Sequence, residues 1–112
     1  MALVSYEDFL KITILAGTIL SAEENNELIK PSIVLSIDFG ENIGIKKSSA
    51  QLKKNYQCRD LVGKQVAAVI NFSPKQIGNF LSEVLVLGFP DENKDPILIS
   101  PDTKIINGKR LF

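Results

Sequence analysis

The sequence predicts an all-β fold, a small closed β-barrel formed by a chain of 112 residues. Short runs of β-branched and aromatic residues recur along the chain, with turn-forming residues between them. Glycines interrupt these runs, as the bends of small barrels require. Strands do not alternate with long helices, which argues against a parallel α/β sheet. A five-stranded OB-type barrel fits this length and pattern, and a small β-sandwich is the alternative.

The chain is expected to begin with a short helix that leads into the first strand. Ser5 and Asp8 have the spacing of a capping box. The following run "KITILAGTIL" is rich in β-branched residues, and we expect Gly17 to mark a bulge or bend in that strand. The polar run "SAEENNELIK" is expected to form a loop.

The clearest strand signal is "PSIVLSIDFG", in which apolar and polar residues alternate. One face of this strand would carry Ile33, Leu35, Ile37 and Phe39. The next run, "ENIGIKKSSAQLKKNY", predicts a turn, a short third strand and then a helical turn. That helix would begin near Ala50, with Ser48 or Ser49 as its cap and Leu52 on its buried side.

The second half of the chain predicts more strands. "KQVAAVINF" and "SEVLVLGF" are almost continuously apolar, so both of their faces should be covered, which points to a partner subunit over one face. "PILIS" is expected to be the last core strand. The Asn-Gly pair in "TKIINGKRLF" predicts a hairpin in a C-terminal extension. The whole chain, residues 1–112, is interpreted as a single domain.

Composition argues against an enzyme. The chain has no histidine, which removes the commonest general base and metal ligand at neutral pH, and Cys58 is its only cysteine. We therefore expect no catalytic residues, no metal and no cofactor. A single cysteine and the lack of an evident export signal predict a cytoplasmic protein. No apolar run approaches the ~18 residues that a membrane span needs, so no membrane insertion is expected.

The net charge is zero, but the charges are distributed unevenly. Residues 1–41 carry a net charge of −5, residues 42–82 carry +6 and residues 83–112 carry −1. A basic face hidden in a balanced total would attract polyanions such as RNA. The alternative is that a solvated stretch has drifted by a few charges without any function.

Two segments carry the candidate binding residues. The first supplies flexible cations and polar groups that suit phosphate and sugar oxygens, namely Lys46, Lys47, Ser48, Ser49, Gln51, Lys53 and Lys54. In the second, "NFSPKQIGNF", Asn71 and Gln76 offer hydrogen bonds and Lys75 a charge. Phe72 and Phe80 could stack on unpaired bases, although the sequence favours their burial in the barrel.

These residues resemble the CsaA proteins, members of the tRNA-binding-domain family. The resemblance runs over essentially the full length and is most specific in "IGIKKSSAQL" and in the segment that contains Asn71, Pro74, Ile77, Gly78 and Ser82. It implies an OB barrel whose terminal additions form a homodimer. It also implies that tRNA binds through Lys46, Lys47, Ser48, Ser49, Gln51, Asn71, Lys75 and Ser82.

The resemblance also implies an alternative function. CsaA proteins are regarded as chaperones (holdases) that assist protein export by binding unfolded polypeptides or the export machinery. Ser73 and Leu81 depart from the pattern of the tRNA binders, in which a proline and a polar residue are common. An apolar Leu81 suits a peptide-contacting groove slightly better than a purely phosphate-contacting surface.

Overall fold

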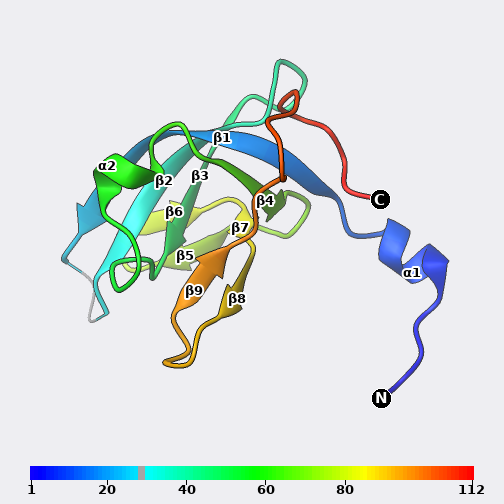
Figure 1. Cartoon of the computed structure of the whole chain (residues 1–112), viewed down its shortest axis with the longest axis horizontal. Helices are drawn as coiled ribbons and strands as arrows, with labels where there is room; N and C mark the ends of the chain where they lie inside the picture. The colour runs from blue at the N-terminus through cyan, green and yellow to red at the C-terminus, as the bar shows by residue number, and fades with distance from the viewer. Residues whose placement is uncertain (28–29) are drawn as a thin grey trace.

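The computed structural model describes residues 1–27 and 30–112, and its largest element is a curled antiparallel sheet (Figure 1). The sheet has five strands in the order β3-β2-β1-β4-β7. Their bounds are β1 Ile14–Asn25, β2 Ser32–Asp38, β3 Ile45–Ala50, β4 Gln65–Val69 and β7 Leu85–Val86. The described residues also form two hairpins and two short helices, namely β5 Lys75–Ile77 with β6 Phe80–Ser82, β8 Gly88–Pro90 with β9 Pro96–Leu98, α1 Tyr6–Leu10 and α2 Cys58–Leu61. The predicted all-β, OB-like fold is confirmed, and a short helix, α2, does follow the third strand, although it begins at Cys58 and not near Ala50.

The sheet is held in a curl because the segment before β7, at one edge, bonds to β3, at the other edge. The Glu83 backbone N–H donates to the Lys47 carbonyl at 2.8 Å. The Ser49 backbone N–H donates to Ser82 Oγ at 3.1 Å, so a side chain continues the pairing where the backbone ladder ends. This contact between β3 and the β6–β7 segment gives the sheet the curvature of a barrel.

The core lies inside this curled sheet. The alternation predicted for β2 is confirmed, since Ile33, Leu35, Ile37 and Phe39 are all buried. Every residue of β4 is buried as well, which confirms that both faces of this strand are covered. Here the covering comes from the chain itself, because Val66 and Ala68 pack in the core and Gln65 Nε2 donates to the Ile105 carbonyl of the C-terminal segment at 2.7 Å.

The first strand differs from its prediction in two ways. It continues to Asn25, because residues 21–25 pair with β2, so the expected loop "SAEENNELIK" is wrong up to Asn25, and its residues 28–29 lie outside the described residues. The register shifts between Ile19 and Ser21, not at Gly17. Gly17 is instead a packing position, since a Cβ there would lie 2.7 Å from the side chains of Ile37 and Phe39.

Two later elements also differ from their predictions. No helix begins near Ala50, because Ser48 to Ala50 pair with β2 as part of β3, and Leu52 is buried in the turn that follows. The run "SEVLVLGF" is not one covered strand. It is divided between β7 and β8, and both Leu85 and Phe89 are exposed.

The segment of residues 105–111 covers the part of β1 that β2 leaves free. The Ala16 N–H donates to the Lys109 carbonyl at 2.9 Å, and the Gly108 N–H donates to the Ala16 carbonyl at 2.8 Å. The predicted Asn-Gly turn forms at Asn107–Gly108, with Gly108 at a φ of 91°, but an isolated bridge from Arg110 to β1 replaces the hairpin partner strand.

The helix α1 stands away from the barrel (Figure 1). The predicted cap is confirmed, since Ser5 Oγ accepts a hydrogen bond from the Asp8 N–H at 3.0 Å. No residue of α1 is buried, and Leu3, Val4 and Tyr6 are strongly exposed. Residues 1–10, called the arm below, therefore form an apolar projection that is mostly exposed, and an Arg110 hydrogen bond to the Leu10 carbonyl at 2.6 Å joins its end to the C-terminal segment.

Candidate nucleic-acid interface

Strand β3 carries an exposed lysine, Lys47, next to a serine that points inward, Ser48. The side chain of Ser48 is 1% exposed, and its Oγ donates to the Val84 carbonyl at 3.0 Å. Lys47, on the neighbouring position, is exposed. Of the predicted contacts on this strand, Ser48 thus holds the barrel together, whereas Lys47 is available to a ligand.

Two of the predicted lysines lie beside acidic side chains. Lys46 Nζ lies 3.9 Å from Glu83 Oε2, and Glu83 Oε1 accepts the Lys47 backbone N–H at 3.0 Å. Lys53 Nζ lies 3.5 Å from Glu24 Oε2. These pairs are partly exposed, so each contributes at most about 1 kcal/mol to stability. They still offset the positive charge of both lysines at short range.

Asn71 uses both ends of its side-chain amide within the protein. Its Oδ1 accepts the Thr13 backbone N–H at 2.8 Å, and its Nδ2 donates to the Lys11 carbonyl at 2.7 Å. These bonds join the end of β4 to the chain between α1 and β1. The geometry fits a residue that holds residues 11–13 in place.

Ser82, the last predicted residue of the motif, is also engaged internally. It is buried, and its Oγ accepts the Ser49 N–H described above while lying 3.4 Å from the Val84 carbonyl. Ser49 Oγ in turn lies 2.8 Å from Ser32 Oγ. Both serines therefore position β3 against the segment that carries the motif.

The hairpin β5–β6 presents the rest of the motif to solvent. Lys75 faces Ser82 across the pair, and Gln76 faces Leu81, so that Lys75, Gln76 and Leu81 are exposed. Gly78 begins the two-residue turn with a φ of 57°, as a type II′ turn requires. Beside it, Asn79 Oδ1 accepts a hydrogen bond from Asn25 Nδ2 at 3.2 Å, which ties the hairpin to the end of β1.

A groove of about 390 Å³ lies between β3, the hairpin β5–β6 and the segment that leads into β7. We call it the motif groove. Its lining residues are Ser49, Phe72, Ser73, Lys75, Ile77, Ser82, Glu83, Val84 and Leu85. It therefore brings Ser49 of the first candidate segment together with Lys75 of the second and with Ser82, and its apolar lining was not indicated by composition alone.

The remaining predicted residues border a second depression, of about 490 Å³. Gln51, Lys53 and Lys54 line it, together with Lys30 and Asp95. Ser49 lines the motif groove, whereas Gln51, two residues further along, lines the second depression. The structure thus divides the predicted residues, with Ser49, Lys75 and Ser82 at one hollow and Gln51, Lys53 and Lys54 at another.

Sequence reasoning missed several residues of this surface and misjudged one. Glu83 and Glu24 lie far from their lysines in sequence, so their pairing had no local signal. Phe72 was expected to be buried, yet its side chain is 53% exposed at the wall of the motif groove, whereas Phe80 is partly buried. The proline two residues after Phe72 was the available signal, because a strand that meets proline usually ends.

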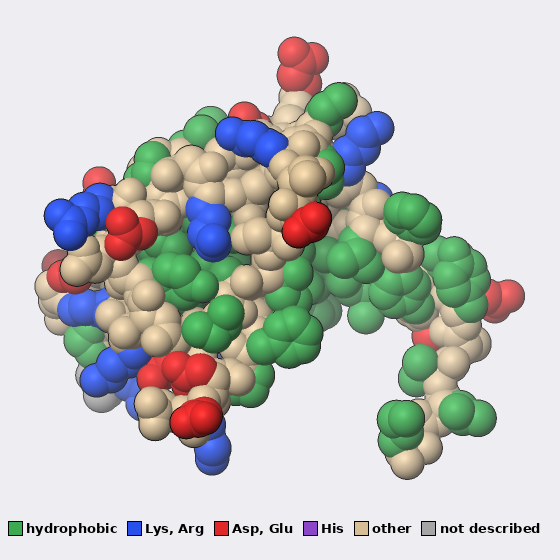
Figure 2. All heavy atoms as spheres, viewed as in Figure 1, with side chains coloured by type: hydrophobic (Ala, Val, Ile, Leu, Met, Phe, Trp, Pro, Cys, Tyr) green, Lys and Arg blue, Asp and Glu red, His purple; other side chains and the backbone are tan. Residues whose placement is uncertain are grey.

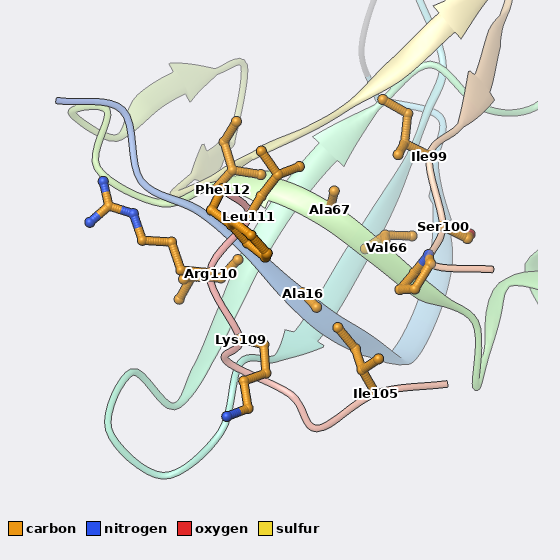
Figure 3. Close-up of a pocket in the computed structure, with 13 residues that line it drawn as sticks. Ala16, Val66, Ala67, Ile99, Ser100, Ile105, Lys109, Arg110, Leu111 and Phe112 are labelled. Carbon is orange, nitrogen blue, oxygen red and sulfur yellow. The ribbon is translucent and has the colours of Figure 1, made fainter. Parts of the chain in front are cut away.

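A third groove, of about 360 Å³, lies between strands β1 and β4 and the C-terminal segment, and we call it the apolar groove. Ala16 of β1, Ala67 of β4, and Leu111 and Phe112 are among the residues that line it (Figure 3). Hydrophobic side chains also gather on the face between the hairpin β8–β9 and the arm (Figure 2). Phe89 and Ile97, which face each other across that hairpin, are both exposed.

Neither a metal centre nor a membrane helix is found in the described part of the chain. Within residues 1–27 and 30–112, no three His, Cys, Asp or Glu side chains are grouped so that they could hold a metal ion. In the same ranges, no helix has the length and apolar character needed to cross a membrane.

Comparison with known proteins relates the chain to a domain family. Residues 14–110 match the family described as "Putative tRNA binding domain". The chaperone CsaA of Bacillus anthracis is 45% identical, with a TM-score of 0.93 over 99% of this chain and 100% of that one. The CsaA chaperone of Picrophilus torridus is 44% identical, with a TM-score of 0.90 over 98% and 100% of the two chains.

Part of a larger enzyme is also similar. Methionine–tRNA ligase of Methanococcoides burtonii is 34% identical over an alignment of 103 residues that covers 89% of this chain but only 14% of the ligase. The chain thus spans a small part of the length of the ligases that it matches. The family match covers both the barrel and the motif groove, and the chain belongs to the tRNA-binding-domain family.

Proposed function

We propose that the protein is a non-catalytic tRNA-binding protein of the cytoplasm that acts as a homodimer. The observation that carries the proposal is the motif groove, where Lys75 lies opposite β3 with its exposed Lys47. Family membership supports tRNA as the ligand. The chain matches a region that makes up about a seventh of a methionine–tRNA ligase, which supports a binding role without catalysis.

The lysines of this surface suit recognition of the RNA backbone. Flexible ammonium groups bind phosphate oxygens without reading base identity, so they position an RNA and do not select a sequence. Lys47, Lys54 and Lys75 are exposed, and in the described part of the chain they take part in no ion pair. We therefore expect about three or four phosphate contacts per protomer.

A homodimer would cover the apolar surfaces described above. The arm exposes Leu3, Val4 and Tyr6, and the apolar groove and the hairpin β8–β9 lie on the body that it overhangs. Exposed apolar surface of this extent is typical of an interface. The terminal segments of one copy would pack against the body of another. Sedimentation at micromolar concentration should give twice the mass of the 12.4 kDa chain, and a monomer alone would refute the dimer.

The experiment that tests tRNA binding is a titration at several salt concentrations. With three or four phosphate contacts, affinity should fall roughly 20- to 200-fold between about 50 mM and about 200 mM salt. The double variant Lys47→Ala, Lys75→Ala should bind all tRNAs more weakly and with a shallower salt dependence. Lys104→Ala, an exposed lysine outside the motif groove, is the matched control. Absence of binding at low salt would refute the proposal.

A second candidate function, binding of unfolded polypeptide, is favoured by one feature of the same surface. Leu81 and Leu85 are 48% and 49% exposed beside the motif groove, and two similar structures are of CsaA chaperones. A holdase in protein export should suppress aggregation of an unfolded client, and Leu81→Asp should abolish this while the lysine variants do not. Equal loss with the lysine variants would instead indicate that charge carries the activity.

A further inference from the structure

Phe72 is an aromatic side chain that the fold leaves at the wall of a groove. More than half of its surface is exposed. The preceding residue, Asn71, is fixed by its hydrogen bond to Thr13, but Phe72 itself stays at the surface. Residues 71–74 form a bend between β4 and β5, so Phe72 belongs to neither strand. Its ring contributes to the motif groove and not to the barrel core.

The groove combines the features that recognise a nucleobase. Phe72, Ile77 and Leu85 supply aromatic and aliphatic walls, which suit the flat face of a base. The Lys75 ammonium and the Glu83 carboxylate at the lining supply a donor and an acceptor for base edges or an adjoining phosphate. Its volume of about 390 Å³ is within the usual range of small-ligand sites, about 300–1,000 Å³.

We propose that the motif groove holds one unpaired nucleobase of the bound RNA, stacked on the Phe72 ring. The adjoining phosphates would lie toward Lys47 and Lys75. This inference rests on the proposed tRNA binding and adds the part of the RNA that is recognised. Bases in a duplex are stacked on their neighbours, so only a loop, bulge or single-stranded end can supply such a base.

Charge favours RNA over an apolar peptide side chain as the occupant. Lys47 and Lys75 are exposed beside the groove, and Glu83 is the acid that lines it. Because Glu83 already lies beside the Lys46 ammonium and accepts the Lys47 N–H, these β3 groups partly offset its negative charge. A neutral peptide side chain would gain nothing from these cations, whereas a base carries its own phosphate to them.

The chain contains no tryptophan, so a Phe72→Trp variant would place a single fluorescent reporter at the groove wall. Stacking of a base on the indole should quench its emission. Phe89→Trp, at an exposed phenylalanine of β8 outside the groove, is the matched control. The probes are a tRNA, a single-stranded oligouridylate, a fully paired RNA duplex and a chemically unfolded protein.

We expect the tRNA and the oligouridylate to quench Phe72→Trp and to leave Phe89→Trp nearly unchanged. The duplex should bind through its phosphates without quenching. Phe72→Ala should weaken oligouridylate binding about 5- to 100-fold, because a stacked base contributes that much to affinity. The duplex should lose little, which separates a stacking defect from a folding defect.

Other outcomes would overturn the inference in distinguishable ways. If the wild-type protein binds tRNA with steep salt dependence but Phe72→Ala binds every RNA equally well, the base site is refuted and tRNA binding stands. If the unfolded protein quenches the emission of Phe72→Trp and RNA does not, the groove binds polypeptide and not a nucleobase. If the wild-type protein binds no RNA at low salt, the proposed function fails and the base site fails with it.

Discussion

Replacing Asn71 by alanine should loosen residues 11–13 while leaving most of the tRNA affinity intact. The substitution removes the acceptor of the Thr13 N–H, at 2.8 Å, and the donor to the Lys11 carbonyl, at 2.7 Å. A protein hydrogen bond contributes a net 0.5–1.5 kcal/mol, and both bonds here are exposed to water. The free energy of unfolding should therefore fall by about 1–2 kcal/mol.

Three measurements separate a structural role for Asn71 from direct contact with RNA. Urea unfolding gives the loss of stability, and hydrogen exchange at the Thr13 amide should become faster because this N–H loses its acceptor. Titration with tRNA should show a smaller loss than Lys75→Ala produces. Gln57→Ala is the control, because Gln57 is exposed and its side chain makes no capping hydrogen bond to α2.

The opposite pattern would refute this reasoning. If Asn71→Ala leaves both the unfolding free energy and the Thr13 exchange rate unchanged but weakens tRNA binding as much as Lys75→Ala, then Asn71 contacts the ligand. In that case the two bonds to residues 11–13 would contribute little in solution, and the amide would be free to turn toward RNA.

Three further predictions concern the core, the charge and the pH dependence. Gly17→Ala should cost about 1–3 kcal/mol in urea unfolding, because its Cβ would lie 2.7 Å from Ile37 and Phe39 side chains, and an unchanged midpoint would contradict this. Glu83→Gln keeps an acceptor for the Lys47 N–H but removes a charge, so tRNA should bind up to about fivefold more tightly at low salt, whereas weaker binding would count against the pairing. The Asn55 side chain and the Asp95 N–H both donate to Asp91 and hold the pKa of its carboxyl below the usual range. The ionised Asp91 carboxylate therefore stabilises the fold above about pH 3.9, and this stabilisation is lost as the pH falls through the pKa of the folded state. An NMR titration of Asp91 with a midpoint at or above about 3.9 would contradict this prediction.

Burial patterns predicted the core well, because they depend on local periodicity. Alternation in β2 and the apolar run of β4 both indicated which residues are buried. Local signals failed where tertiary pairing overrode them. Ser48 could cap a helix in isolation, but pairing of Ser48 with Leu35 of β2 keeps this residue in a strand. In "SEVLVLGF" the composition could not show that hydrogen bonding changes partners at Leu87.

The sequence identified the segments that form the candidate site but not the contacts or the exposure of their individual side chains. The lysines and the Pro-Gly loop drew attention to the correct segments, since exposed charge and turn residues are visible in a sequence. The engagement of Asn71 depends on contact with residues about 60 positions earlier, and no local pattern reports this. The exposure of Phe72 likewise depends on where β4 ends relative to the hairpin β5–β6.

The basic segment of residues 42–82 looks more strongly charged in the sequence than it is in space. Glu24 and Glu83 lie outside that segment, yet each lies within 4 Å of one of its lysines. A surface that retains few unpaired cations attracts RNA but holds it weakly through charge alone, since each phosphate contact is screened by salt. Tight binding then needs a contribution that salt does not screen, and the exposed ring of Phe72 provides the apolar surface for it. On this reasoning, affinity at high salt should depend more on Phe72 than on Lys47.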